Sequence, residues 1–118
     1  MSISAPTLEN TEKDLANEII VSADSHIMEP TDLWTNNLPA NFKGRYPEFP
    51  PRNGIGEKPG GWDPKARIEE MAVDGVSAEV LYPTLGLRLF ALEDAELQEA
   101  CFEIANDWLI DYCKVHPS

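Results

Sequence analysis

The chain has 118 residues, of which 42% are hydrophobic and 25% charged, a composition that suits one small globular domain and excludes a disordered or membrane-spanning protein. Nine Lys and Arg against 21 Asp and Glu give a formal net charge of -12, which repels phosphate backbones and anionic lipid and excludes nucleic acid as an expected partner. No apolar stretch approaches a membrane span and the N-terminus lacks the pattern of a signal peptide, so we expect a cytoplasmic protein without membrane contact.

The N-terminal part of the chain divides into a lead-in and the start of a domain. Residues 1–18 are polar and show no sustained period, which predicts a flexible lead-in, and residues 19–118 form the domain. The β-branched run at Ile19, Ile20 and Val21 continues to residue 23 and predicts a short buried strand.

A long loop follows over residues 27–62, where repeated prolines discourage helices and central strands. Loops of this length in compact domains usually line or cover a site. The aromatic residues of this loop either form a lid over a planar substrate or pack into a small satellite cluster. They are Trp34, Phe42, Tyr46, Phe49 and Trp62.

The middle of the chain predicts a helix between two parallel strands. Asp63 can accept hydrogen bonds from the first helical N–H groups, Pro64 suits the first helical position, and Gly75 ends the helix. Residues 76–82 then form a strand that Pro83 stops. The order strand, helix, strand predicts a parallel βαβ unit and the α/β fold class.

A second helix opens at Asp94 and runs to about residue 115. Its apolar residues recur with a period near 3.6, so they mark one face, which we expect to lie against the sheet. That face comprises Leu97, Cys101, Ile104, Ala105, Trp108, Leu109 and Tyr112. Cys101 and Cys113 are too far apart along this helix to bridge each other and are expected to be reduced.

The triplet Asp24-Ser25-His26 stands at the C-terminal end of the first predicted strand. Residues two apart on an extended chain point to the same side, so the carboxylate and the imidazole can converge on one divalent cation. The alternative is an exposed pair that only caps a turn. The C-terminal ends of parallel strands are where barrel enzymes place catalytic groups, which favours the metal site.

Several motifs, taken in order and spacing, carry a resemblance to a known family. They are Ala-Asp-Ser-His-Ile-Met-Glu-Pro at residues 23–30, Asp-Leu-Trp at 32–34 with Leu-Pro at 38–39, Gly-Trp-Asp-Pro at 61–64 leading to Arg67, and Asp-Gly-Val at 74–76 with Val-Leu-Tyr-Pro-Thr at 80–84. From Val21 onward the sequence resembles the amidohydrolase-related proteins, in particular the group of aminocarboxymuconate-semialdehyde decarboxylase and the dihydroxybenzoate-type decarboxylases.

The resemblance implies the N-terminal βαβα segment of a (β/α)8 TIM-type barrel, incomplete here because a whole barrel takes roughly 250 residues. It implies a metal-dependent hydrolase or decarboxylase, a carbon-carbon lyase, that acts on a small carboxylated and often aromatic compound. Asp24 and His26 match the family's first two metal ligands, and zinc or manganese is the expected ion. The family's later ligands have no counterpart in this sequence, so the isolated chain is expected to be inactive.

Five further residues have expected roles. Glu29 either orients His26 or is only a polar residue ahead of a proline. Tyr82 and Thr84 follow the second strand to the same rim and are candidate substrate contacts, whereas Arg67 is expected to pair with a carboxylate. His116 has no metal role in this reading and is expected at the surface.

Two other classes of protein stay open. The chain can be a non-catalytic remnant or an assembly module, because two strands leave a sheet face and edge exposed and invite association. The partner would then be a second copy of the chain or the missing C-terminal segment of the barrel. The third reading is a compact α/β binding domain without metal affinity.

Overall fold

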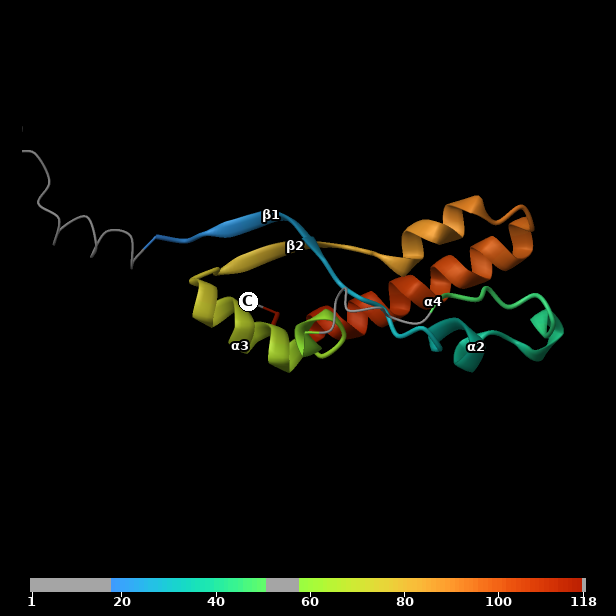
Figure 1. Ribbon diagram of the computed structural model, residues 1–118, viewed down its shortest axis with the longest axis horizontal. Helices are drawn as coiled ribbons and strands as arrows, with labels where there is room; N and C mark the ends of the chain where they lie inside the picture. Colours follow the sequence, from blue (N-terminus) through green and yellow to red (C-terminus); the bar gives the residue numbers. More distant parts are fainter. Residues whose placement is uncertain (1–17, 51–57, 118) are drawn as a thin grey trace, which may run out of the picture.

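A computed structural model describes residues 18–50 and 58–117 of the chain (Figure 1). The predicted lead-in falls outside the described residues except for Glu18, and so do residues 51–57 of the long loop. The fold is mixed α/β with a small parallel sheet. Its elements are β1 (Val21–His26), α2 (Leu33–Asn37), the 3-10 turns η1 (Ala40–Phe42) and η2 (Pro59–Gly61), α3 (Pro64–Asp74), β2 (Ala78–Tyr82), the 3-10 helix η3 (Leu85–Ala91) and α4 (Ala95–Lys114).

The two strands run parallel, as the βαβ order predicts, but their pairing is irregular. Ser22 pairs with Glu79 and Ser25 with Leu81, so β1 carries one more residue than β2 between these two pairs. Such a bulge turns the side chains that follow it. The hydroxyl oxygens of Ser22 and Ser25 consequently lie 2.6 Å apart on one side of the strand.

The first strand differs from its prediction in place and in burial. It runs from Val21 to His26 rather than over residues 19–23, because hydrogen bonding to β2 continues through the polar triplet. Burial was also predicted wrongly, since Ile19 is 81% exposed and Ile20 43%. Among the described residues the helices cover only one face of the sheet, so a β-branched run is no guarantee of burial here.

Helix α3 begins and ends as the sequence predicts. The carboxylate of Asp63 accepts hydrogen bonds from the backbone N–H groups of Lys65 and Ala66, and Pro64 occupies the first position. Gly75 follows the last residue with φ 71°, in the left-handed region that a residue without a side chain adopts freely. These local signals explain why the boundaries were predictable.

Helix α4 starts where predicted, with the Asp94 carboxylate accepting from the N–H of Leu97. Its predicted apolar face is also the packed face, but the expectation that it lies against the sheet is wrong for most of its length. Leu97 and Cys101 pack with α2 and η3 instead. The core therefore sits beyond the ends of the strands, and its buried members are Leu33, Trp34, Leu38, Phe42, Leu85, Leu89, Leu97 and Cys101.

The long loop contributes much of that core through α2, a helix that the sequence analysis did not predict. Trp34 is fully buried, its indole N–H donates to the backbone oxygen of Cys101 at 3.0 Å, and its ring lies 4.7 Å from that of Phe49. Phe42 is buried in the cluster, and Tyr46 packs against it. Packing, rather than a lid over a substrate, is thus what these four aromatic side chains do in the structure.

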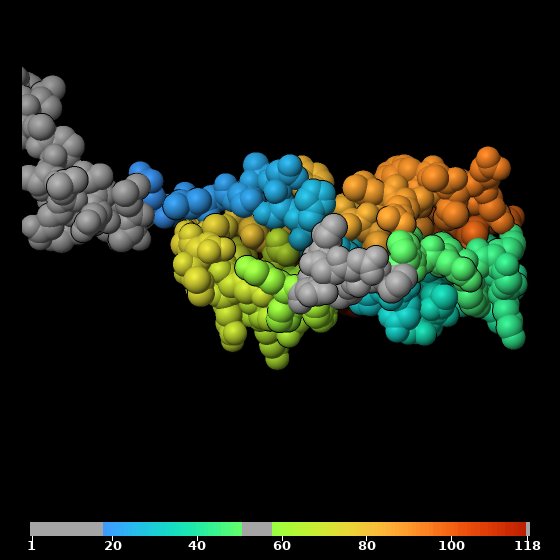
Figure 2. All heavy atoms as spheres, viewed as in Figure 1, coloured from blue at the N-terminus to red at the C-terminus, as the bar shows by residue number. Residues whose placement is uncertain are grey.

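One face of the sheet is open. Figure 1 shows α3 and the end of α4 on one side of the two strands, and the space-filling view shows β1 along the upper border of the described molecule (Figure 2). On the other side lie Val21, Asp24, His26, Val80 and Tyr82, which we call the open face; its apolar members are 45 to 55% exposed. Neither α4 nor any other helix among the described residues has the length and apolar character needed to cross a bilayer.

Candidate functional site

Asp24 and His26 meet at the C-terminal end of β1, on the open face. The Oδ1 atom of Asp24 lies 3.3 Å from Nε2 of His26, and the two side chains are 81% and 48% exposed. The i, i+2 spacing predicts this meeting, since alternate residues of a strand share a face. Their role as metal ligands stays a prediction.

The other nitrogen of the His26 ring is held by the backbone. Nδ1 lies 3.1 Å from the carbonyl oxygen of Pro83, the residue that follows β2. A carbonyl oxygen only accepts hydrogen bonds, so Nδ1 must carry the proton of this bond. In a neutral ring the lone pair then belongs to Nε2, the nitrogen that faces Asp24, and this is the arrangement in which imidazole binds metals.

The pair fits two positions of a metal shell. Two ligand atoms each about 2.1 Å from a tetrahedral zinc ion stand about 3.4 Å apart, close to the observed Asp24 to His26 separation. Within residues 18–50 and 58–117, however, no group of three or more His, Cys, Asp and Glu side chains could hold an ion. The same separation also suits an ion pair between a carboxylate and a protonated ring, so the two readings are separated by metal binding.

A shallow hollow of about 480 Å³ lies beside the pair, lined by Ala23, Asp24, His26, Tyr82 and Leu87. The ring of Tyr82 is 6.0 Å from that of His26 and tilted by 41°, so this predicted contact residue does border the pair. Leu87 was not predicted, because it comes from η3, and nothing in the sequence indicates that this 3-10 helix returns to the end of β1.

Thr84 does not line that hollow. It lies between the segments that follow β1 and β2. Its hydroxyl donates to the backbone oxygen of Ile27 at 2.6 Å, and the N–H of Ile27 donates to the oxygen of Tyr82 at 3.0 Å. These bonds join the segment after β1 to the segment after β2. Contact of Thr84 with a substrate stays a prediction.

Glu29 is almost completely buried, with 1% of its surface exposed. Its carboxylate accepts hydrogen bonds from three successive backbone N–H groups, those of Thr84, Leu85 and Gly86, at 2.8 to 3.3 Å. The buried charge is thereby matched by oriented donors at the start of η3. The side chain is therefore more than a polar residue ahead of a proline.

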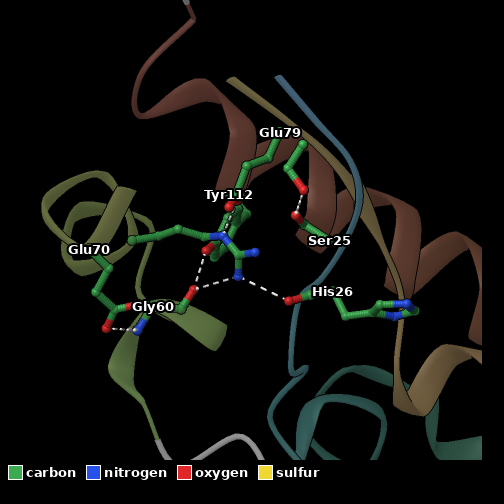
Figure 3. A network of polar contacts seen from close by, with 8 residues as sticks. Ser25, His26, Gly60, Glu70, Glu79 and Tyr112 are labelled. Carbon is green, nitrogen blue, oxygen red and sulfur yellow. Dashed lines mark hydrogen bonds and ion pairs between the residues drawn. The ribbon is translucent and has the colours of Figure 1, made fainter. Parts of the chain in front are cut away.

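Arg67 joins α3 to both strands, and Figure 3 labels its partners Glu79, His26 and Gly60. Its guanidinium donates to Oε2 of Glu79 at 2.5 Å, to the backbone oxygen of His26 at 3.0 Å and to that of Gly60 at 3.3 Å. Burial alone lowers the pKa of Arg67, but the hydrogen bond and charge of Glu79, with a further contribution from Tyr112, outweigh it and the pKa is raised. The prediction that Arg67 pairs with a carboxylate is confirmed.

The remaining chemically active side chains lie apart from the pair. Both cysteines are free thiols, as predicted; Cys101 is buried in the core and Cys113 is exposed. Burial raises the pKa of the Cys101 thiol to about 11. His116 lies at the surface near the end of the chain, as expected.

Neither a scan against protein-family models nor a search of curated proteins finds a match for this chain. The resemblance to the amidohydrolase-related proteins thus depends on the motifs alone.

Proposed function

We propose that this chain supplies part of the active site of a metal-dependent hydrolase or decarboxylase with an amidohydrolase-type barrel. Asp24 and His26 would hold a divalent ion, zinc or manganese, and the substrate would be a small carboxylated compound, in many cases aromatic. The observation that carries the proposal is the approach of Asp24 Oδ1 to His26 Nε2, 3.3 Å apart, while Pro83 holds the opposite ring nitrogen.

The arrangement of the layers supports the barrel. In a (β/α)8 barrel the helices form an outer ring, the other face of the strands turns inward, and active sites lie at the C-terminal ends of the strands. Here α3 covers one face of the parallel pair, and Asp24 and His26 lie on the opposite one, at the C-terminal end of β1. The open face would then be the interior of the barrel.

A bound divalent ion would polarise a substrate oxygen or lower the pKa of a water molecule. The chain's own residues prepare the place for it. Asp24 supplies a negative charge, and His26 supplies a neutral nitrogen whose direction the carbonyl of Pro83 sets. Tyr82 and Leu87 form the apolar wall of the adjoining hollow, against which the planar part of a substrate would lie.

Two protein ligands leave a tetrahedral shell half filled. The other positions would be taken by water, by the substrate, or by side chains outside the described residues, from a further barrel segment or a second copy of the chain. Affinity of the chain by itself should accordingly be weak, and turnover is not expected from it.

Metal binding to the purified chain tests the proposal. We expect zinc or manganese titrated into the chain to bind, and the substitutions Asp24→Asn and His26→Gln each to lower the affinity by at least about tenfold, because even outer partners of metal ligands contribute that much. Asp107→Asn and His116→Gln are matched controls, since each removes the same group from an exposed position on or after α4. Equal affinities in all five proteins would remove the metal site.

A second candidate, an assembly module, is favoured by the open face. Val21, Val80 and Tyr82 expose 55, 45 and 45% of their surface on a sheet whose outer edges pair with no other strand among residues 18–50 and 58–117, and such edges invite association. Sedimentation at increasing concentration tests it, with Val80→Ser as the variant. An oligomer that Val80→Ser disrupts, together with no metal binding, would favour the module, whereas a monomer without metal affinity would favour an unrelated α/β binding domain.

A further inference from the structure

We propose that Glu29 is a positioning residue for His26, acting through the peptide group between Pro83 and Thr84. This inference rests on the proposed function, because it concerns how the imidazole of the same site is prepared. In this arrangement the carboxylate does not contact the ring directly. A backbone carbonyl contacts His26, and the Glu29 carboxylate accepts hydrogen bonds from the N–H side of the same backbone.

The carboxylate of Glu29 is hydrogen-bonded to the turn after β2. Oε1 accepts from the N–H of Gly86 at 3.0 Å and from that of Thr84 at 3.3 Å, and Oε2 accepts from Leu85 at 2.8 Å and from Thr84 at 3.2 Å. Both oxygens thus share the N–H of Thr84. Because the group is buried, these bonds are not in competition with solvent, and they fix the direction of each N–H.

One rigid group, the peptide between Pro83 and Thr84, links this carboxylate to the histidine. The N–H of Thr84 and the carbonyl of Pro83 belong to the same planar peptide unit, and the described chain contains no cis peptide bond. In a trans peptide the N–H and the carbonyl point in opposite directions. Holding the N–H toward Glu29 therefore aims the carbonyl away from it, and that carbonyl is the partner of His26 Nδ1 at 3.1 Å.

A second bond holds Thr84, the residue on the nitrogen side of this peptide. The hydroxyl of Thr84 donates to the backbone oxygen of Ile27 at 2.6 Å, two residues before Glu29 in the same segment. The segment after β1 thus binds Thr84 twice, once through a carboxylate and once through its backbone. The three groups, Glu29, Thr84 and Pro83, form a continuous path of hydrogen bonds and covalent geometry that ends at the imidazole.

The contact with Pro83 also affects which nitrogen of the His26 ring carries the proton. Free imidazole side chains favour the proton on Nε2, so a ring with its proton on Nδ1 needs a fixed acceptor there. The carbonyl of Pro83 supplies it and leaves Nε2 of His26 with its lone pair toward Asp24. Loss of the hydrogen bonds to Glu29 should let the peptide rotate and weaken the hydrogen bond between Nδ1 and the Pro83 carbonyl. Part of the population should then return to the Nε2–H form.

Substitution of Gly86 is an independent way to disturb the hydrogen bonds of the Glu29 carboxylate. A side chain at this position would place its Cβ 3.0 Å from Oε1 of Glu29 and 3.0 Å from Cβ of Pro83, closer than ordinary contact. Gly86→Ala therefore pushes on the carboxylate and on Pro83 without removing any donor or acceptor. It complements Glu29→Gln, which keeps the shape of the side chain but turns one acceptor into a donor.

The experiment reads the tautomer of His26 by long-range 1H–15N correlation on the imidazole. All proteins carry His116→Gln, which leaves one histidine in the chain, and no metal is present. Spectra are recorded at a pH where the nitrogen shifts show a neutral ring. We expect a larger Nδ1–H population with Glu29 than without it, and Glu29→Gln and Gly86→Ala each to shift the population toward Nε2–H, for which the Asp24 carboxylate is the acceptor.

Gln98→Ala is the matched control, because Gln98 donates to the oxygens of Leu89 and Leu92 and so holds the far end of η3. It should destabilise the same 3-10 helix and leave the tautomer unchanged. An unchanged tautomer population in folded Glu29→Gln and Gly86→Ala proteins overturns the inference and assigns Glu29 a structural role only.

Zinc titration of the same proteins separates this inference from the proposed function. If the chain binds zinc, Glu29→Gln should weaken binding by about tenfold although both ligands are intact, as loss of an outer partner does. If the chain binds no zinc but the tautomer still responds to Glu29→Gln, the metal site fails and the positioning role of Glu29 stands.

Discussion

At the scale of single residues, burial separates two thiols that the sequence presents alike. Cys101 has no exposed surface and burial raises its pKa to about 11, whereas Cys113 is exposed on the last turns of α4. Because the thiolate is the reactive form, only an accessible thiol should react quickly in the folded protein.

We therefore predict one fast and one slow thiol in reaction with a chromogenic disulfide at about pH 8, below the usual pKa of a free cysteine. Cys113→Ser should abolish the fast reaction, and denaturant should release the slow one. Cys101→Ala should retain the fast phase and lack the slow one. Two equally fast thiols in the folded wild-type protein would contradict the burial of Cys101.

The candidate site shows which residue-scale features a sequence can reveal. The approach of Asp24 to His26 follows from their spacing on one strand, so it was predictable. Glu29 was also a predicted candidate to orient His26, but the contacts through which it acts were not predictable, because His26 meets Pro83 across 57 positions and Glu29 meets Leu85 across 56. Contacts of that separation depend on the register of β1 on β2. A bulge shifts this register, and no local sequence pattern predicts the bulge.

At the scale of elements, the helices were predicted where a residue side chain satisfies their first N–H groups. Asp63 and Asp94 both do so, and both helices begin at the next residue. The 3-10 helix η3 has no such cap from its own neighbours, because the distant Glu29 performs that function. Helix α2 was missed for a related reason: its preceding residue, Asp32, makes no side-chain cap, and prolines flank it.

The cap of α4 gives a prediction on acid stability. The hydrogen bond from the N–H of Leu97 is the main cause that lowers the pKa of Asp94, and the guanidinium of Arg45 adds to it. A lowered pKa in the folded state means that this carboxylate stabilises the protein above the ordinary pKa of an aspartate and that the contribution is lost as the pH falls through the lower pKa of the folded state.

Urea unfolding at several pH values from about 6 down to about 2.5, across the usual range of carboxylates, measures this contribution. Asp94→Asn keeps an oxygen for the cap but does not titrate, so its stability should fall less with acid than that of the wild-type protein. Asp107→Asn, at an exposed position within α4, should leave the acid dependence as it is. Identical pH profiles for the wild type and Asp94→Asn would show that the cap carries no charge-dependent stability.

At the scale of the whole molecule, the side chain of Arg67 joins helix α3 to both strands and to the turn η2. It binds Glu79 of β2, the backbone of His26 in β1 and that of Gly60 before α3, and the hydroxyl of Tyr112 in α4 donates to the same Gly60 oxygen. The pair of Arg67 and Glu79 is largely buried, with each side chain 14% exposed. Its loss should therefore loosen the contact of α3 and the end of α4 with the sheet.

We predict that Arg67→Met costs about 3 to 5 kcal/mol, because it leaves the Glu79 charge buried without its partner. The double variant Arg67→Met with Glu79→Leu should recover a large part of that loss, since both charges are then gone. Thermal and urea unfolding of the single and double variants give the two values. A double variant that is less stable than Arg67→Met would mean that the charge of Glu79 has another role.

The open face of the sheet is either exposed to solvent or covered in solution by a partner that packs on the strands. Val21 and Val80 expose 55% and 45% of their surface on this face, next to Tyr82, whereas Val73 is 86% exposed on α3. A dye that becomes fluorescent on contiguous apolar surface should bind the chain, and the double change Val21→Ser with Val80→Ser should remove most of its signal at little cost in stability. Val73→Ser removes an equal apolar side chain outside the open face and should leave the signal nearly unchanged. A large loss of stability in the double variant would instead show that these valines are already buried against something in solution, which is the outcome expected if copies of the chain cover each other's sheets.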